Sequence, residues 1–166
     1  TFDDCQKIVK DILKDTDYCV HNDISAVNSI NWARIMIQSV YYFYTFINFA
    51  ERATNKVNFS VPTGNFGDIY AGYISYKMGL PINKLIVATN ENDILDRFMK
   101  TGVYETKAVV KTSSPSMDIQ VASNFERLLF DILNQSNTET KSSMENFEKN
   151  RKISVSEKNL NKVREV

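Results

Sequence analysis

Residues 57–89 constrain the fold most, because a strand pattern, a glycine-containing loop, a helix pattern and a second strand pattern follow one another there. Apolar and polar residues alternate over 57–61 and Pro62 closes the run, which predicts a short strand. The run 84–89 is almost continuously apolar, as in a parallel strand covered on both faces. The helical pattern between them ends at Gly79, a residue type common at helix C-termini. Right-handed crossover geometry then predicts two parallel strands in one sheet.

The predicted fold class is α/β, a three-layer sandwich with a parallel sheet and helices on both of its faces. The chain has 166 residues, about the length of one domain, and 43% of them are hydrophobic, which suffices for a buried core. This composition excludes a disordered chain, a collagen-like repeat and a disulfide-stapled miniature protein.

Other patterns predict the elements around this unit. The stretch 30–49 is apolar on nearly every helical face and is expected to lie at the centre of a large core. Asp93 begins a short helix that Gly102 ends, and 108–110 is expected to form a brief strand. Further elements are predicted over 2–14 (helix), around Pro115 (turn) and over 121–133 (helix).

The apolar content falls after Gln135, which predicts a domain boundary there. Residues 1–135 are assigned to the α/β domain, and 136–166 to a polar helical or flexible insertion or tail. Phe147 and Ile153 leave open the alternative that this segment docks on the main domain.

Charge balance and cysteine spacing exclude several kinds of function. Lys+Arg and Asp+Glu both number 20, so the chain lacks the basic excess with which proteins bind nucleic acid. Cys5 and Cys19 show no CxxC spacing and His21 is the only histidine, so neither a metal site nor a histidine-based triad is expected. The two thiols favour a reducing compartment. Polar residues interrupt the apolar stretch 28–50, so no membrane span is expected.

The glycine loop carries the strongest chemical signal in the chain. Gly64 and Gly67 lie between a predicted strand and the start of a helix, where unpaired N–H groups and the helix dipole attract an anion. Glycine permits positive φ and removes Cβ atoms that would keep a phosphate from the backbone. The pattern is neither a Walker A motif nor GxGxxG, so the spacing alone favours a tight turn that needs glycines over a phosphate site.

Six sequence blocks closely resemble threonine synthases of the type shared by many bacteria and fungi. The block around the loop reads Val-Pro-Thr-Gly-Asn-Phe-Gly-Asp-Ile-Tyr-Ala-Gly over 61–72. The others are Phe-Asp-Asp-Cys-Gln at 2–6, Asn-Ser-Ile-Asn-Trp-Ala-Arg at 28–34, Lys-Met-Gly-Leu-Pro-Ile at 77–82, Ala-Thr-Asn-Glu-Asn-Asp-Ile-Leu at 88–95 and Ser-Pro-Ser-Met-Asp-Ile at 114–119.

The resemblance implies a pyridoxal 5'-phosphate (PLP) enzyme of fold type II, with 1–135 forming part of its larger, PLP-binding domain. Such an enzyme converts O-phosphohomoserine and water to threonine and phosphate, here in the cytoplasm. In this family the loop holds the cofactor phosphate. The implied cofactor-binding residues are Gly64, Asn65, Phe66, Gly67 and Asp68. We expect Asp68 to cap backbone N–H groups and to turn its carboxylate away from the phosphate.

Two functional groups of the family have no counterpart in this chain. The Schiff-base lysine of the family lies in Phe-Lys-Asp after a His-Gly-Pro-Thr motif, and no lysine here has that context. The group that hydrogen-bonds the pyridine nitrogen is also expected elsewhere. We therefore assign no catalytic residue and no metal to the chain, and interpret it as an internal fragment, inactive alone. Its implied partners are O-phosphohomoserine and the remainder of the same polypeptide.

Two alternatives stay open. One is another fold type II lyase, such as a threonine dehydratase-like enzyme or a relative of cysteine synthase, although the Asn-Phe-Gly-Asp loop and the Asn-Glu-Asn-Asp block argue against it. The other is a non-catalytic remnant or binding module that keeps the anion loop.

Several polar residues have both a structural and a functional interpretation. Residues 28–31 either line the substrate cleft or cap the following helix. Asp93 is expected to cap its helix, and His21 to be an ordinary surface histidine. Ser113, Ser114 and Ser116 are expected to form a turn around Pro115 first and to contact substrate second.

Overall fold

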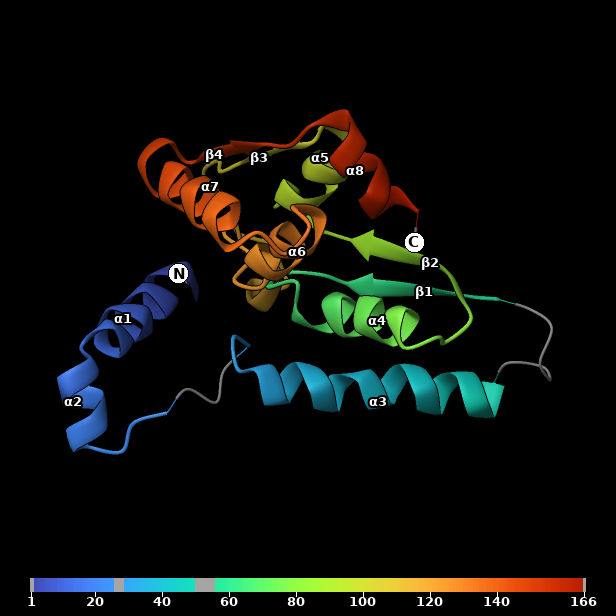
Figure 1. The fold of residues 1–166 in the computed structure, drawn as a ribbon, viewed down its shortest axis with the longest axis horizontal. Coiled ribbons are helices and arrows are strands. Elements are labelled where there is room, and N and C mark those ends of the chain that lie inside the picture. Colours follow the sequence, from blue (N-terminus) through green and yellow to red (C-terminus); the bar gives the residue numbers. More distant parts are fainter. Residues whose placement is uncertain (1, 26–28, 50–55, 166) are drawn as a thin grey trace.

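A computed structural model describes residues 2–25, 29–49 and 56–165 of the chain (Figure 1). Its elements in order are α1 (Phe2–Lys14), α2 (Thr16–His21), α3 (Trp32–Phe49), β1 (Val57–Pro62), α4 (Gly67–Lys77), β2 (Ile82–Ala88), α5 (Ile94–Thr101), β3 (Val103–Glu105), the 3-10 turn η1 (Pro115–Met117), α6 (Phe125–Ile132), α7 (Asn137–Asn150), β4 (Lys152–Ser154) and α8 (Glu157–Arg164). The predicted α/β class is confirmed.

Strands β1 and β2 form the predicted parallel pair, joined through α4. Phe59 lies opposite Leu85, and Val61 lies opposite Val87, so these four side chains share one face of the sheet. All four are buried or half-buried. The strand–loop–helix–strand unit predicted over 57–89 is therefore confirmed, with α4 beginning at Gly67, directly after the glycine loop.

The other face of this sheet is open among the described residues. Asn58, Ser60, Lys84 and Ile86 alternate with the covered side chains and are exposed, Ile86 to 48%. Helix α4 lies next to the covered face of the sheet, and α3 packs on the far side of α4 (Figure 1). Of the three predicted layers, the described residues thus supply the sheet and the helices on one side.

A glycine allows α3, α4 and the sheet to approach closely. A Cβ atom on Gly72 would lie 2.7 Å from Cζ of Tyr42 in α3 and 2.9 Å from Cδ2 of Leu85 in β2. The Tyr42 ring in turn packs edge-on against Phe59, with ring centroids 4.9 Å apart. Because Gly72 has no side chain, Tyr42 of α3 reaches past α4 and packs against the sheet.

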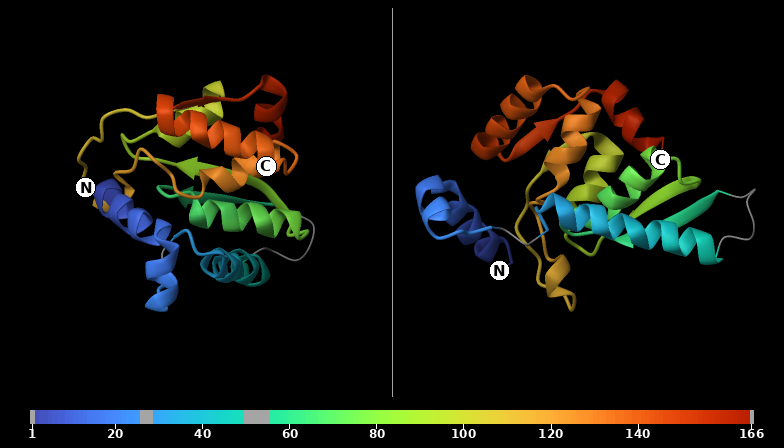
Figure 2. Two further views of the ribbon diagram at one scale, coloured as in Figure 1. Left: turned by 60° about the vertical axis from the view of Figure 1, so that its left-hand side comes forward. Right: turned by 60° about the horizontal axis from the view of Figure 1, so that its bottom comes forward.

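The position of α3 differs from the expectation of a central helix. Only Ile35 and Tyr42 are buried among its side chains, whereas Ile47 and Phe49 are 74% and 77% exposed. The reason is that α3 packs along α4 on one side only (Figure 1). Helices α1 and α2 lie at one side of the main body of the chain (Figure 2), and Ile8 of α1 is 62% exposed.

A second, antiparallel pair joins the C-terminal segment to the rest of the chain. Tyr104 of β3 lies opposite Ile153 of β4, and both side chains are buried. Phe147 of α7 and Leu160 of α8 are buried as well, so residues 136–165 pack against the rest of the chain. The division of the chain near residue 135 stays a prediction.

The predicted strand 108–110 is wrong, since the short strand in this region is β3 at 103–105. The backbone of Val110 instead bonds to the Asn92 side chain: its N–H donates to Oδ1 at 2.9 Å, and its carbonyl accepts from Nδ2 at 2.8 Å. The Asn92 amide thus bonds to the N–H and the carbonyl of Val110, the two backbone groups through which this residue would pair with a neighbouring strand.

Helix α6 begins at Phe125, four residues later than the predicted start at 121. The preceding residues are held by other contacts, as when the Ala122 N–H donates to the Tyr104 hydroxyl at 2.8 Å. Phe125 then stacks on Tyr104, with centroids 3.9 Å apart and 3° between the planes. Phe98 meets Phe125 edge-on at 4.7 Å, so aromatic rings from α5, β3 and α6 form the centre of this core.

Candidate functional site

The glycine loop leaves the carboxyl end of β1 and runs into the first turn of α4. Thr63 fixes its start, because its N–H donates to the Ala88 carbonyl at 2.8 Å and its hydroxyl to the Val61 carbonyl at 2.6 Å. Ligands of open α/β sheets bind at this end of parallel strands. The predicted site residues 64–68 are thus brought together in one turn at a position suited to ligand binding.

Phe66 has the left-handed backbone of this loop, with φ 64° and ψ 8°. Neither Gly64 nor Gly67 has a positive φ, so the expectation that the glycines supply this conformation is wrong. A side chain at either glycine position would instead crowd its neighbours. A Cβ on Gly64 would lie 2.8 Å from Cδ1 of Ile119, and one on Gly67 would lie 3.3 Å from Nδ2 of Asn124.

The backbone N–H groups of residues 64–69 have no hydrogen-bond acceptor among the described residues. The first N–H of this region with a protein partner is that of Tyr70, which donates to the Phe66 carbonyl at 3.2 Å. A left-handed residue beside a helix start turns successive N–H groups to one side, which produces an anion-binding concavity. The loop can therefore bind a phosphate through its backbone.

The Asp68 side chain does not cap the helix as expected. Its Oδ1 atom is buried and has no hydrogen-bond partner among the described residues. The Tyr42 hydroxyl donates to the backbone carbonyl of Asp68 at 2.9 Å. Burial raises the pKa of the Asp68 carboxyl, against a smaller lowering by the Tyr42 hydroxyl.

Residues that the sequence did not single out hold the loop in place. Asn124 donates to the Asn65 carbonyl from its backbone N and from Nδ2, both at 3.1 Å. The Ser123 hydroxyl lies 3.4 Å from Oδ1 of Asn65 and donates to Oε1 of Gln6 in α1 at 2.6 Å. The only signal in the sequence was a polar pair before an apolar helix, which resembles an ordinary cap.

A polar network fixes the 112–119 segment, which packs against Gly64. Asp118 accepts hydrogen bonds from the Thr112 hydroxyl at 2.7 Å, the Thr112 N–H at 2.9 Å and Nδ2 of Asn90 at 2.8 Å. The Thr112 hydroxyl and N–H, followed by Asn90, lower the pKa of the Asp118 carboxyl. Asn92 adds a longer bond to Asp118 at 3.2 Å, so the Asn-Glu-Asn-Asp block serves to position this segment.

Three other predicted roles have mixed outcomes. Asp93 pairs with Arg97, Nε to Oδ1 at 2.8 Å, and does not cap α5 through its side chain. Asn28 lies outside the described residues, and in its segment Oδ1 of Asn31 accepts from the Ala33 N–H at 2.9 Å at the start of α3. Ser114 and Ser116 are exposed beside the turn at Pro115, as expected for turn residues.

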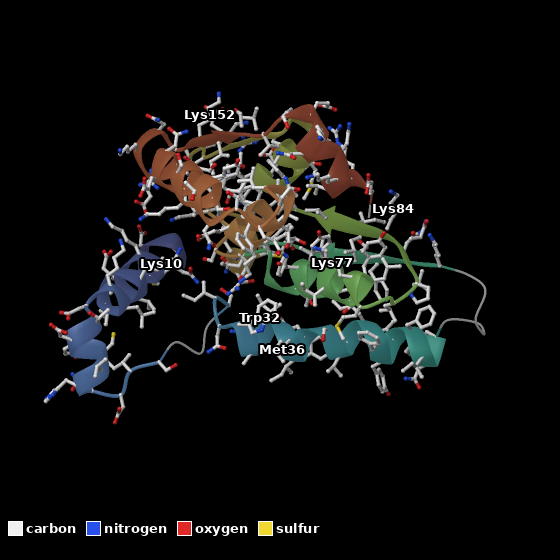
Figure 3. The ribbon with its side chains drawn as sticks, viewed as in Figure 1. Lys10, Trp32, Met36, Lys77, Lys84 and Lys152 are labelled. Carbon is white, nitrogen blue, oxygen red and sulfur yellow. The ribbon has the colours of Figure 1, made fainter. Side chains whose placement is uncertain are left out.

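The lysines labelled in Figure 3, Lys10, Lys77, Lys84 and Lys152, lie on four different elements, α1, α4, β2 and β4. Lys77 pairs with Asp131 at 3.6 Å, Lys152 pairs with Glu105 at 3.4 Å, and Lys84 donates to the Arg164 carbonyl at 3.1 Å. Among the described residues, no group of three His, Cys, Asp or Glu side chains could hold a metal ion. None of the described helices combines the length and apolarity needed to cross a bilayer.

The fold is an α/β unit in which a glycine loop joins a parallel strand to a helix N-terminus, a geometry suited to an anion. Comparisons with known proteins name the family. The chain is 56% identical to threonine synthase of Corynebacterium glutamicum over 140 residues, which are 82% of this chain and 29% of that protein. It is 47% identical to the Pseudomonas aeruginosa enzyme over 165 residues, 99% of this chain and 35% of that protein. No family model matches.

Solved structures agree with the sequence relatives. The chain matches PLP-bound threonine synthase from Brucella melitensis with a TM-score of 0.88 and 48% identity, over 99% of this chain and 35% of that one. It matches the yeast enzyme with a TM-score of 0.84 and 45% identity, over 99% of this chain and 34% of that one. The chain belongs to the threonine synthase family and spans about a third of the length of these relatives.

Proposed function

We propose that this chain is the cofactor-phosphate-binding part of a PLP-dependent threonine synthase of fold type II. The whole enzyme would convert O-phosphohomoserine and water to threonine and phosphate. The observation that carries this proposal is the row of backbone N–H groups of residues 64–69, which have no acceptor among the described residues. Gly64, Asn65, Phe66, Gly67 and Asp68 are the proposed cofactor-binding residues.

The residues present fit a phosphate group. The loop offers backbone donors at the N-terminus of an 11-residue helix, whose dipole favours an anion. The two glycine positions have neighbours where a Cβ would lie, so both keep the backbone in close contact with the loop's surroundings. The Oδ1 atom of Asp68 is buried and has no hydrogen-bond partner among the described residues, and burial raises the pKa of this carboxyl.

The described residues contribute binding and orientation in this proposal. When bound, PLP supplies the electron-withdrawing ring that makes bond cleavage at the substrate amino acid feasible. The loop N–H groups would anchor the phosphate, and the buried Phe66 side chain would hold the loop against the core. We assign no proton transfer to a residue of this chain, and place the lysine that attaches the cofactor elsewhere in the enzyme.

We also propose that the remainder of the same polypeptide covers the open faces of this chain. The apolar side chains Ile37, Tyr41 and Ile47 of α3 are 65%, 62% and 74% exposed, and clustered exposed apolar side chains mark surfaces that contact another part of a protein. The exposed face of the sheet also indicates that another part of the polypeptide covers it.

We further propose a cytoplasmic location. Cys5 and Cys19 are free thiols, which supports this proposal.

The test uses the complete polypeptide that carries these residues, purified and supplied with PLP. We expect it to bind PLP, seen by the absorbance of the bound cofactor, and to release phosphate and threonine together from O-phosphohomoserine. Phosphate release without threonine, or turnover of threonine to a 2-oxo acid in its place, would indicate another lyase of this fold. A polypeptide that binds no PLP would support the non-catalytic alternative.

A further inference from the structure

Asn124 joins three segments that are far apart in the sequence. Its side chain is fully buried, with 0% exposure. Its Nδ2 donates to the Ser29 carbonyl before α3 at 2.8 Å and to the Asn65 carbonyl in the glycine loop at 3.1 Å. Its own backbone N–H donates to the same Asn65 carbonyl at 3.1 Å. The carbonyl of Asn65 therefore accepts two hydrogen bonds from a single residue of another element.

Arg127 fixes the orientation of the Asn124 amide. Nε of Arg127 donates to Oδ1 of Asn124 at 3.0 Å, and Nη2 donates to the Ile30 carbonyl at 2.7 Å. The guanidinium also lies over the ring of Trp32, 5.3 Å from its centroid. Because a guanidinium only donates, the amide must present oxygen to Arg127 and nitrogen to the two carbonyls. All hydrogen-bonding atoms of the side chain are thus used.

The bond to Asn65 determines where the next N–H points. A trans peptide is planar, and its C=O and N–H groups point in opposite directions. Since Asn124 holds the Asn65 carbonyl, the Phe66 N–H of the same peptide is directed to the opposite side. This N–H is one of the loop donors without an acceptor among the described residues, and Phe66 has the left-handed backbone that a free loop would avoid.

We propose that Asn124 is a positioning residue for the cofactor phosphate: it holds the Asn65–Phe66 peptide so that its N–H, and not its carbonyl, faces the phosphate. This inference rests on the proposed function of the loop. Without the Asn124 amide, the Asn65 carbonyl keeps only the backbone N–H of residue 124 as a donor, so the peptide is held less firmly and rotates more easily. Rotation would direct a carbonyl oxygen toward the phosphate, which repels it, and would withdraw one N–H donor.

The test compares variants of the complete polypeptide as apo-protein, titrated with PLP and separately with inorganic phosphate. Asn124→Ala removes the amide. The control is Leu160→Ala, since Leu160 is also buried, at 1% exposure, and lies in α8 (Glu157–Arg164), away from the loop. Thermal unfolding of each variant reports its stability. We expect Asn124→Ala to weaken PLP and phosphate binding by at least about tenfold, and Leu160→Ala by less than about twofold although it also lowers stability.

Asn124→Asp supplies a second readout at nearly constant side-chain size. A carboxylate cannot donate to the two carbonyls, whereas a protonated carboxyl can donate one hydrogen bond. We expect the dissociation constant of this variant for PLP, divided by that of wild type at the same pH, to fall as the pH is lowered from about 8 to about 5. A purely structural role for Asn124 predicts no such change in the ratio.

Each outcome decides the proposal. Equal losses of affinity in Asn124→Ala and Leu160→Ala, or unchanged PLP binding in both Asn124 variants, would overturn it. If both Asn124 variants fail to fold, Asn124 acts on the fold and the positioning role is wrong. If the wild-type polypeptide binds neither PLP nor phosphate, the proposed function fails first, and the inference fails with it.

Discussion

Gly72 and Tyr42 approach so closely that a Cβ atom on Gly72 would lie 2.6 Å from Cε1 of the tyrosine ring. This contact joins α4 to α3 and makes a helix-interior glycine necessary at a position where alanine has the higher helix propensity. The relationship matters for the site, because α4 carries the loop at its N-terminus and Tyr42 donates to the Asp68 carbonyl in its first turn.

We predict that Gly72→Ala lowers the free energy of unfolding by about 1–3 kcal/mol, although alanine favours the helix by about 1 kcal/mol. The measurement is urea unfolding of the complete polypeptide. Tyr42→Leu provides the control, since it removes the ring that meets the new Cβ. The double variant should be more stable than the sum of the two single losses implies. If the two losses of stability simply add, the contact with Tyr42 is not the reason why residue 72 is a glycine.

Phe147 connects the segment 136–166 to the central core. It is 3% exposed and its ring centroid lies 5.2 Å from that of Tyr104. We predict that Phe147→Ala costs about 3–5 kcal/mol, measured by denaturant unfolding. Lys149→Ala, at an exposed position of the same helix, should change stability by less than about 0.5 kcal/mol. A small effect of Phe147→Ala would show that the C-terminal segment is dispensable for the fold.

The Asp118 network predicts a pH dependence of stability. Hydrogen bonds from Thr112 and then from Asn90 lower the pKa of the Asp118 carboxyl in the folded state, whereas an unfolded Asp titrates near about 3.9. A lowered folded pKa stabilises the fold at pH values above the unfolded pKa, and this contribution is lost as the pH falls through the folded pKa. We therefore expect Asp118→Asn to unfold with a weaker dependence on pH below about 4 than wild type. Identical pH profiles would contradict this role.

The sequence predicted the unit over 57–89 because its signals are local. Alternation, Pro62 and Gly79 each act within a few residues, and the structure follows them. Asn124 could not be found in the same way, since its partners Ser29 and Asn65 are 95 and 59 positions away. The short strand at Tyr104 was missed for the same reason, because its pairing depends on Ile153.

The left-handed residue of the glycine loop is not a glycine. Glycines suggest positive φ, yet the left-handed residue is Phe66, and its side chain is buried at 4% exposure. Tertiary packing of the ring thus stabilises a backbone conformation that local preference disfavours. Tertiary packing also determines the exposure of α3. Its apolar composition indicates a buried helix, but its outer face is open in the described residues.

Gly67 offers a direct test of close packing at the loop. A Cβ there would lie 3.3 Å from Nδ2 of Asn124, and the branches of valine would extend further into the same space. We predict that Gly67→Val lowers PLP affinity by about tenfold or more, measured by absorbance titration. Thermal unfolding of the same sample separates this effect from a loss of folded protein. A folded variant that retains PLP normally would remove Gly67 from the proposed binding residues.

A crystal structure of the complete polypeptide with PLP tests the loop assignment most directly. We predict that phosphate oxygens lie within about 2.7–3.2 Å of at least two backbone nitrogens of residues 64–69, with the Asn65 carbonyl still bonded to Asn124. A phosphate bound at another place, with these N–H groups left to solvent, would contradict the assignment.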